Sequence, residues 1–275
     1  MDLRERTRRR TRRNAVGIPR RVAAMLPPLV SVALLSACTL VRGPGAAAPL
    51  AASLQDIIPH GDRDHFVYVW ERRSDGEPLG TGIQVEHVTA LDTPGEFEIA
   101  LSEDAQATGR VRIRDDGKAI VLLTEDDLPR GIRLTYDPPL PYLEAPVRAG
   151  ELNASSTANV TGLDDGAPIG SLRVTQTTQI SALAHVHALL GDYTHAVAVR
   201  TVRNIQGAEG GIEMRMALVL VPGIGEISSD GTVAGAPALH RELACALVAG
   251  KPIGNCRQLQ QTLKEFSRPE SSDVP

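Results

Sequence analysis

Residues 111–123 read VRIRDDGKAIVLL, and this stretch decides the fold class of the chain. Apolar, mostly β-branched side chains gather at both of its ends, which is typical of β-strands. Asp115-Asp116-Gly117 lies between them, and an Asp-Gly turn between apolar runs indicates a β-hairpin, because these residues accept positive φ angles. The stretch therefore predicts two neighbouring antiparallel strands.

Strand-like segments continue on both sides of this hairpin. They cover residues 66–70, 82–88, 96–101, 132–136, 154–161, 171–180, 182–190, 195–202, 214–221 and 224–228. Prolines 138, 139, 141 and 146 are expected to stop strand pairing until about Leu152, because proline has no N–H for the ladder. Some ten strands in meander order predict one large curved antiparallel sheet or half-barrel.

Helix is expected only near the C-terminus. Residues 238–248 and 256–266 have apolar spacing compatible with helices, and Asn255 is a candidate N-cap for the second. The fold class is therefore mainly β, with short C-terminal helices.

The N-terminal segment contains nine arginines, then an apolar run, then Leu35-Ser36-Ala37-Cys38. The run from Val22 to Ala37 is short for a membrane-spanning helix, which needs ~20 residues, and it contains Pro27-Pro28. This order resembles the signal peptide and lipobox of bacterial lipoproteins. The resemblance implies that residues 1–37 are removed and that Cys38 is acylated, with chains such as palmitate, on the extracytoplasmic side of a membrane.

Three points about this export signal stay open. An uncleaved anchor is the alternative, since counting on to Val41 lengthens the apolar run. Arg12-Arg13 is similar to a twin-arginine signal, which leaves the export route undecided. Thr39 stands where the lipoprotein resemblance places an Asp for inner-membrane retention, so it implies an outer-membrane location if the organism has one.

Removing residues 1–37 changes the charge of the chain from −4 to −11, because nine arginines and two acids are lost. Such an acidic remainder is a poor nucleic-acid binder, so no nucleic-acid partner is expected. Residues 38–53 lack periodicity and many large side chains, which predicts a flexible tether. Residues 54–275 are long enough for a single β-rich domain.

Cys245 and Cys256 remain once Cys38 is assigned to the lipid. An even pair of cysteines in an exported protein favours a disulfide. Two free buried thiols are the alternative.

A second resemblance rests on the motifs in the second half of the chain. Residues 136–140 (YDPPL), residues 191–193 (GDY) and residues 221–226 (VPGIGE) are similar to motifs of a family of curved-sheet bacterial envelope proteins of unknown function. In outline the expected sheet also resembles that of lipoprotein carriers that hold acyl chains. The resemblance implies a concave apolar face for a lipid, or for an envelope protein partner.

The sequence contains no recognisable catalytic set, and no cofactor is expected. His185, His187 and His195 are the candidate metal ligands, because the first two share one face of a strand and the third follows a turn. They would converge only if that turn has an odd number of residues. We therefore expect a lipid-anchored, non-enzymatic binding or structural module for apolar ligands or acyl chains. A metal-dependent envelope enzyme using these histidines is the alternative.

Overall fold

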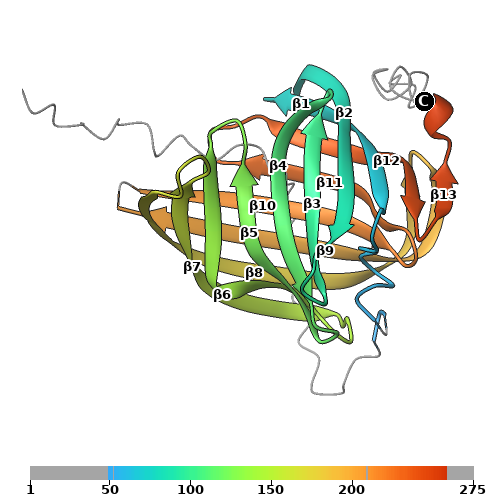
Figure 1. Cartoon of the computed structure of the whole chain (residues 1–275). Coiled ribbons are helices and arrows are strands. Elements are labelled where there is room, and N and C mark those ends of the chain that lie inside the picture. Colours follow the sequence, from blue (N-terminus) through green and yellow to red (C-terminus); the bar gives the residue numbers. More distant parts are fainter. Residues whose placement is uncertain (1–48, 52, 209, 259–275) are drawn as a thin grey trace, which may run out of the picture.

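The computed structural model describes residues 49–51, 53–208 and 210–258. Cys38, most of the predicted tether and the end of the predicted helix 256–266 lie outside the described residues. Thirteen antiparallel strands follow one another in meander order, each pairing with the next (Figure 1). The strands are β1 (His65–Ser74), β2 (Glu77–Ala90), β3 (Glu96–Glu103), β4 (Gln106–Asp115), β5 (Ala119–Asp127), β6 (Ile132–Glu144), β7 (Gly150–Gly162), β8 (Pro168–Ala188), β9 (Gly191–Gly207), β10 (Gly210–Val221), β11 (Gly225–Val233), β12 (Ala238–Val248) and β13 (Lys251–Gly254).

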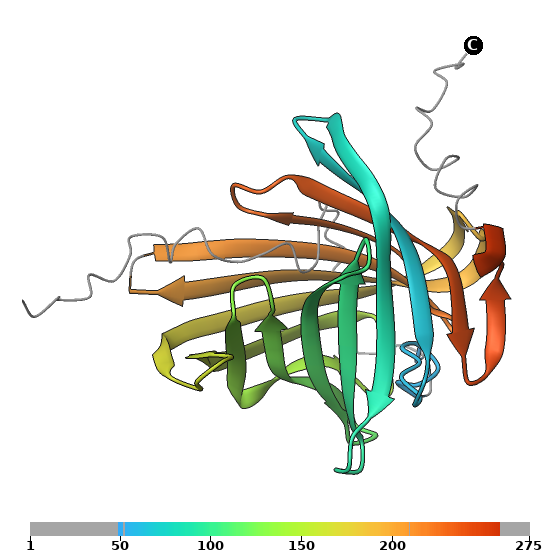
Figure 2. The ribbon, with the colours of Figure 1, turned by 45° about the horizontal axis from the view of Figure 1, so that its top comes forward.

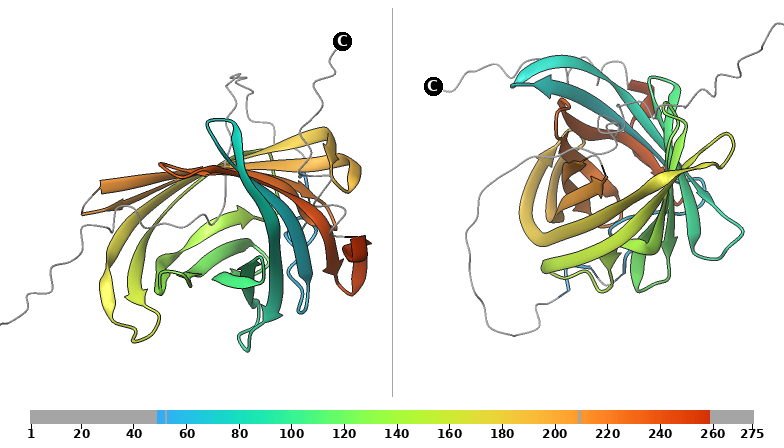
Figure 3. Two further views of the ribbon diagram at one scale, coloured as in Figure 1. Left: turned by 90° about the horizontal axis from the view of Figure 1, so that it is seen from above. Right: turned by 90° about the vertical axis from the view of Figure 1, so that its left-hand side faces the viewer.

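The sheet closes on itself, because β1 pairs with β12 as well as with β2. The closing ladder runs from His65 opposite Leu247 to Arg73 opposite Ala238. Twelve strands therefore form a closed antiparallel barrel, and β13 is attached to β12. In Figures 2 and 3 the green strands β3 to β6 face the yellow and orange strands β8 to β11 across the interior. The mainly β prediction is confirmed, and the predicted open sheet or half-barrel is corrected to a closed barrel.

The predicted helix at residues 238–248 is wrong, because this segment is strand β12. Leu239, Leu243 and Leu247 are four residues apart and fit one face of a helix equally well. In the strand, Arg241 shares the inward phase of Leu239 and Leu243 and is only 7% exposed. Because this inward residue is an arginine, the alternation of apolar and polar residues expected of a strand is not visible in the sequence. The helical segment found among residues 49–258 is the short 3-10 turn η2 (Cys256–Gln258).

The proline-rich part of β6 also differs from the prediction. Pairing with β5 is interrupted between Thr135 and Leu140, and it resumes through Glu144. The gap takes up Pro138 and Pro139, so these prolines bend the strand without ending it. The predicted segment 171–180 and residues 182–188 of the next one fall within one 21-residue strand, β8, and residues 189 and 190 form the turn that follows it.

Residues 53–64, which we name the plug, cover one end of the barrel. Leu54 and Ile57 belong to the main apolar core, and Ile57 is fully buried. The N–H of Gly223 in the β10–β11 turn donates to the carbonyl of Asp56, 2.6 Å away. Nε2 of His60 lies 2.9 Å from Oδ2 of Asp115, in the hairpin formed by residues 111–123. The plug therefore fastens two turns at the same end of the barrel.

Gly82 of β2 lies opposite Trp70 of β1, and a Cβ at this glycine would lie 2.4 Å from Cζ2 of the indole. Gly82→Ala is therefore expected to lower the free energy of unfolding by about 1–3 kcal/mol through overpacking. Gly80→Ala is the matched control, because its Cβ would meet no atom within 4 Å, and we expect a change within about 0.5 kcal/mol. Urea denaturation measures both variants, and equal effects would contradict this prediction.

Candidate functional site

The barrel interior contains a partly open cavity of about 200 Å³. Most of its wall is aliphatic, from strands β3 to β5 on one side and β10 on the other, and Ile58 and Pro59 of the plug close one end. The apolar wall includes Ile99, Leu101, Val111, Ile113, Ile120, Leu122, Met214, Met216, Leu218 and Leu220. An apolar cavity of ~150 Å³ in another protein stays dry and takes up benzene. This cavity therefore has the size and lining for an apolar group.

A buried ionic cluster around Arg241 interrupts this apolar wall. Nε of Arg241 donates to Glu226 at 2.8 Å and to Ser229 at 2.9 Å. Nη1 donates to Glu86 at 2.6 Å, and Nη2 donates to Glu226 at 2.9 Å. The guanidinium also lies 4.3 Å from the ring centroid of Tyr68. We name these five residues the Arg241 cluster, in which two carboxylates face one cation.

Burial is the largest influence on the pKa of Glu86 and raises it, although the nearby Arg241 acts in the opposite direction. The second carboxylate, Glu226, also raises the pKa of Glu86 by repulsion. Burial by itself would lower the pKa of Arg241, but the two carboxylates outweigh it, so this pKa stays well above its usual value. The arginine is therefore charged. The cluster has one carboxylate more than it has cations, and burying this carboxylate in its ionised form costs desolvation free energy.

A second ionic cluster lies on the opposite wall around Arg203. Its Nε donates to the side-chain oxygen of Gln176 at 3.0 Å, and its Nη1 donates to both oxygens of Glu125 at 3.0 and 3.3 Å. The Tyr136 hydroxyl donates to Glu125 at 2.6 Å. We name these four residues the Arg203 cluster, in which one cation faces one carboxylate.

Tyr142 of β6 also lines the cavity and lies within electrostatic reach of both clusters. Burial raises the pKa of its phenol, and Glu226 raises it further, whereas Arg203 and Arg241 lower it. The phenol is therefore neutral at physiological pH. A neutral hydroxyl can both donate to and accept from a polar group in the cavity.

The candidate metal ligands His185, His187 and His195 lie on the outside, near the tip of the β8–β9 hairpin. His187 Nδ1 is 2.8 Å and His185 Nε2 is 3.6 Å from Oδ1 of Asp192. The turn between Ala188 and Gly191 has an even number of residues, so the ladder places His195 out of phase with the other two histidines. Across the described ranges, no three His, Cys, Asp or Glu side chains are grouped to hold a metal ion.

His240, on the outer face of β12, belongs to a partly buried network. Its Nδ1 lies 2.8 Å from Asp230, and its Nε2 lies 3.2 Å from Glu242. Burial would lower the pKa of His240, but these hydrogen bonds outweigh it and raise the pKa to about 9. The other oxygen of Glu242 accepts from the N–H of Leu189 at 2.6 Å, which holds the β8–β9 hairpin against β12.

The raised pKa of His240 predicts a pH dependence of stability. Its contribution is fully present below the unfolded value near 6.5 and is lost as the pH rises through about 9, because the imidazolium then loses its proton. We expect the free energy of unfolding to fall by about 1–3 kcal/mol over this window. Denaturation of the wild type and of His240→Gln between pH 6 and 10 measures it. An equal slope in both proteins would remove His240 as the cause.

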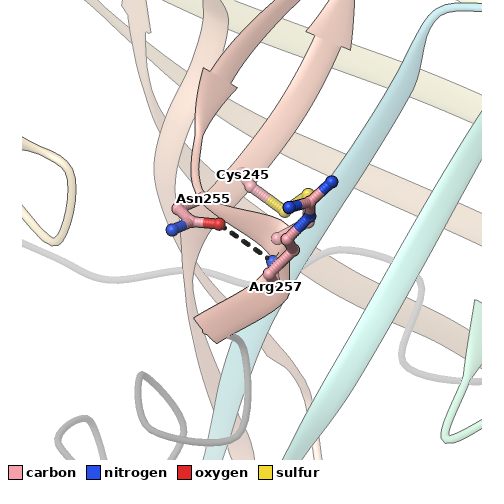
Figure 4. Close-up of a disulfide and its surroundings, with 4 residues drawn as sticks. Cys245, Asn255 and Arg257 are labelled. Atoms are coloured by element: carbon pink, nitrogen blue, oxygen red, sulfur yellow. Dashed lines mark hydrogen bonds between the residues drawn. A yellow bond between two sulfur atoms is a disulfide. The ribbon is translucent and has the colours of Figure 1, made fainter.

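The structure links Cys245 of β12 to Cys256 of η2 by a disulfide (Figure 4). Cys245 is fully buried, and the N–H of Arg257 donates to the side-chain oxygen of Asn255 beside the bridge. The disulfide thus fixes the end of the described chain to the strand that closes the barrel.

The ionic residues inside the barrel were not predicted from the sequence. Arg203 follows Val199 and Thr201 in the inward phase of β9, and Arg241 lies between inward Leu239 and Leu243 on β12. The sequence signal for both is an arginine at a strand position where the alternation would place an apolar, inward-facing residue.

No protein-family model matches the chain, and no curated protein matches it. Two solved structures have similar folds. A protein from Bacteroides fragilis named as exported, with a YmcC-like fold, is 14% identical, with a TM-score of 0.42, over 68% of this chain and 96% of that one. A protein from Parabacteroides distasonis named as a lipoprotein is 8% identical, with a TM-score of 0.44, over 68% and 95%. Neither likeness is close enough to carry a function over to this chain.

No helix in the described part of the chain is both long and apolar enough to span a membrane.

Proposed function

We propose that this protein is a lipid-anchored module of the bacterial cell envelope that binds the apolar part of a small ligand, such as an acyl chain, inside the barrel without chemical change. The observation that carries the proposal is the cavity of about 200 Å³ inside the barrel, whose wall is mostly aliphatic. Ligand pockets are typically concave and apolar, with a few polar groups that orient the ligand. The Arg203 cluster, the Arg241 cluster and Tyr142 are such groups.

A cavity-filling variant tests the binding site. N-phenyl-1-naphthylamine, a neutral fluorophore, serves as the probe, and Leu101→Trp places a larger side chain in the cavity wall. We expect the affinity for the probe to fall about tenfold or more, which corresponds to ~1.4 kcal/mol. Leu79→Trp is the matched control, because Leu79 is 60% exposed, and its affinity should equal that of the wild type.

Circular dichroism of both tryptophan variants shows whether each retains the barrel. A folded Leu101→Trp protein that binds the probe as tightly as the wild type would show that the cavity is not the site. Mass spectrometry of organic extracts from the purified protein gives a second readout, since an acyl ligand should copurify with the wild type.

The anchor is tested separately. Cys38 lies outside the described residues, and its acylation rests on the resemblance of residues 35–38 to a lipobox. We expect Cys38→Ala to move the protein from the membrane fraction to the soluble fraction, because the acyl chains are its attachment. Fractionation of the two membranes of a double-membraned host tests the outer-membrane location implied by Thr39. Continued membrane attachment of the variant would overturn the anchor without affecting the cavity.

A further inference from the structure

The ionisable groups of the cavity wall do not balance. Glu86, Glu125 and Glu226 face Arg203 and Arg241, so the two clusters together carry one negative charge in excess when all are ionised. Two further acids that touch the cavity, Asp126 and Asp127, are paired with Arg133 and Arg130. The excess charge therefore belongs to the Arg241 cluster.

The two arginines in the wall also differ in how many of their guanidinium nitrogens donate a hydrogen bond. Each nitrogen of Arg241 already donates to Glu86, Glu226 or Ser229. Nη2 of Arg203 has no acceptor among the described residues, although Nε and Nη1 do. Arg203 is 5% exposed and lines the cavity, so a ligand in the cavity lies beside this side chain and can supply an acceptor for its guanidinium. Tyr142 supplies a second, neutral donor.

We infer that the cavity selects neutral ligands that carry a carbonyl acceptor on an apolar chain, the class of acyl esters and amides, over free fatty acids. This inference rests on the proposed function. A carbonyl oxygen satisfies the unused donor of Arg203 and adds no charge. A fatty-acid carboxylate would be a fourth buried anion beside two cations that already have carboxylate partners, and an uncompensated buried charge is strongly unfavourable.

Competition between two ligands of equal chain length tests this selectivity. Monodecanoylglycerol is the neutral ester and decanoate is the anion, and each displaces N-phenyl-1-naphthylamine from the full chain carrying Cys38→Ala, which needs no detergent. For this protein, we expect the ester to bind at least about tenfold more tightly at pH 7.5. Because a charged ligand enters any apolar cavity less readily, the deciding measurement is made on a charge variant.

Glu86→Gln removes the excess charge and keeps a side-chain oxygen for Nη1 of Arg241. We expect its affinity for decanoate, taken relative to its affinity for monodecanoylglycerol, to rise about fivefold. Glu77→Gln is the control, because it removes an exposed carboxylate at the start of β2, and it should change neither affinity.

The outcomes separate the two proposals. If the wild type does not bind the neutral fluorophore, the proposed function fails, and the selectivity fails with it. If the fluorophore binds and Leu101→Trp blocks it, but Glu86→Gln leaves the ratio of the decanoate and ester affinities unchanged, the site stands and the selectivity is overturned. Equal binding of ester and anion by the wild type would overturn the selectivity as well.

Discussion

Arg241→Met is expected to lower the free energy of unfolding by about 3–5 kcal/mol at pH 7. The variant keeps Glu86 and Glu226 in the barrel wall but removes the cation to which both are bonded. Methionine replaces most of the apolar volume of the arginine stem, so the loss is mainly the cost of two uncompensated buried carboxylates. Urea denaturation at pH 7 measures the difference from the wild type.

The effect of Arg241→Met should depend on pH in a defined direction. Without the cation, burial raises the pKa of Glu86 further above its unfolded value, so this carboxyl group binds a proton more readily in the folded state. A raised carboxyl pKa stabilises the fold below the unfolded pKa, and this contribution is lost as the pH rises. The deficit of the variant should therefore shrink between pH 7 and pH 5. An equal deficit at both values would assign the loss to packing instead of charge.

Arg215→Met is the matched control for this prediction. Arg215 pairs with Glu213 at 2.6 Å, but the two side chains are 38% and 41% exposed. Solvent and salt screen such a pair, and its loss should change the free energy of unfolding by no more than about 1 kcal/mol. If Arg215→Met lowered the free energy of unfolding as much as Arg241→Met, burial of the ion pair inside the barrel would not be the cause of the effect.

Ile57→Ala in the plug should cost about 2–5 kcal/mol of unfolding free energy. Ile57 has no exposed surface and packs in the core with Leu140, Leu143 and Leu220 among others. Truncation leaves a space that the neighbouring backbone cannot fill readily, because the plug is hydrogen-bonded to the β10–β11 turn through Asp56. Thermal or urea denaturation measures the loss.

Ile169→Ala makes the same change at a site that is 55% exposed, and we expect an effect within about 0.5 kcal/mol. A difference of less than 1 kcal/mol between the two isoleucine variants would mean that the plug opens independently of the barrel. Residues 53–64 would then act as a separately stable segment and not as part of the core.

Local pattern was sufficient to predict most strands. The hairpin at residues 111–123 is found as β4 and β5, and the meander order follows from similar turns along the chain. Barrel closure was not predictable in the same way, because β1 and β12 are far apart in sequence. Each strand has one free edge after pairing with its neighbour in the chain, and its local sequence does not indicate which strand pairs with that edge. The strand β12 was further disguised by the helix-like spacing of its leucines.

The site was harder to predict than the fold. Its aliphatic wall is indistinguishable in sequence from an ordinary core, since both give alternating apolar residues. Glu86 and Glu125 carry no sequence signal of burial, because a single acid in a strand is usually solvated. Only the three-dimensional closure brings them opposite Arg241 and Arg203. The histidines on the outside of the barrel were predicted as metal ligands because their spacing is visible in the sequence. The ionic clusters are assembled from separate strands, so they have no such spacing.

The seam between β1 and β12 also constrains how the protein folds. It joins residues about 165–180 positions apart, so the entropic cost of closing this loop is met only after nearly the whole domain is available. A chain interrupted before residue 238 would leave β1 and β11 as unpaired edges that can pair with other copies. Truncated molecules should therefore aggregate through these edges, and protection of the seam amides from hydrogen exchange should develop last during refolding.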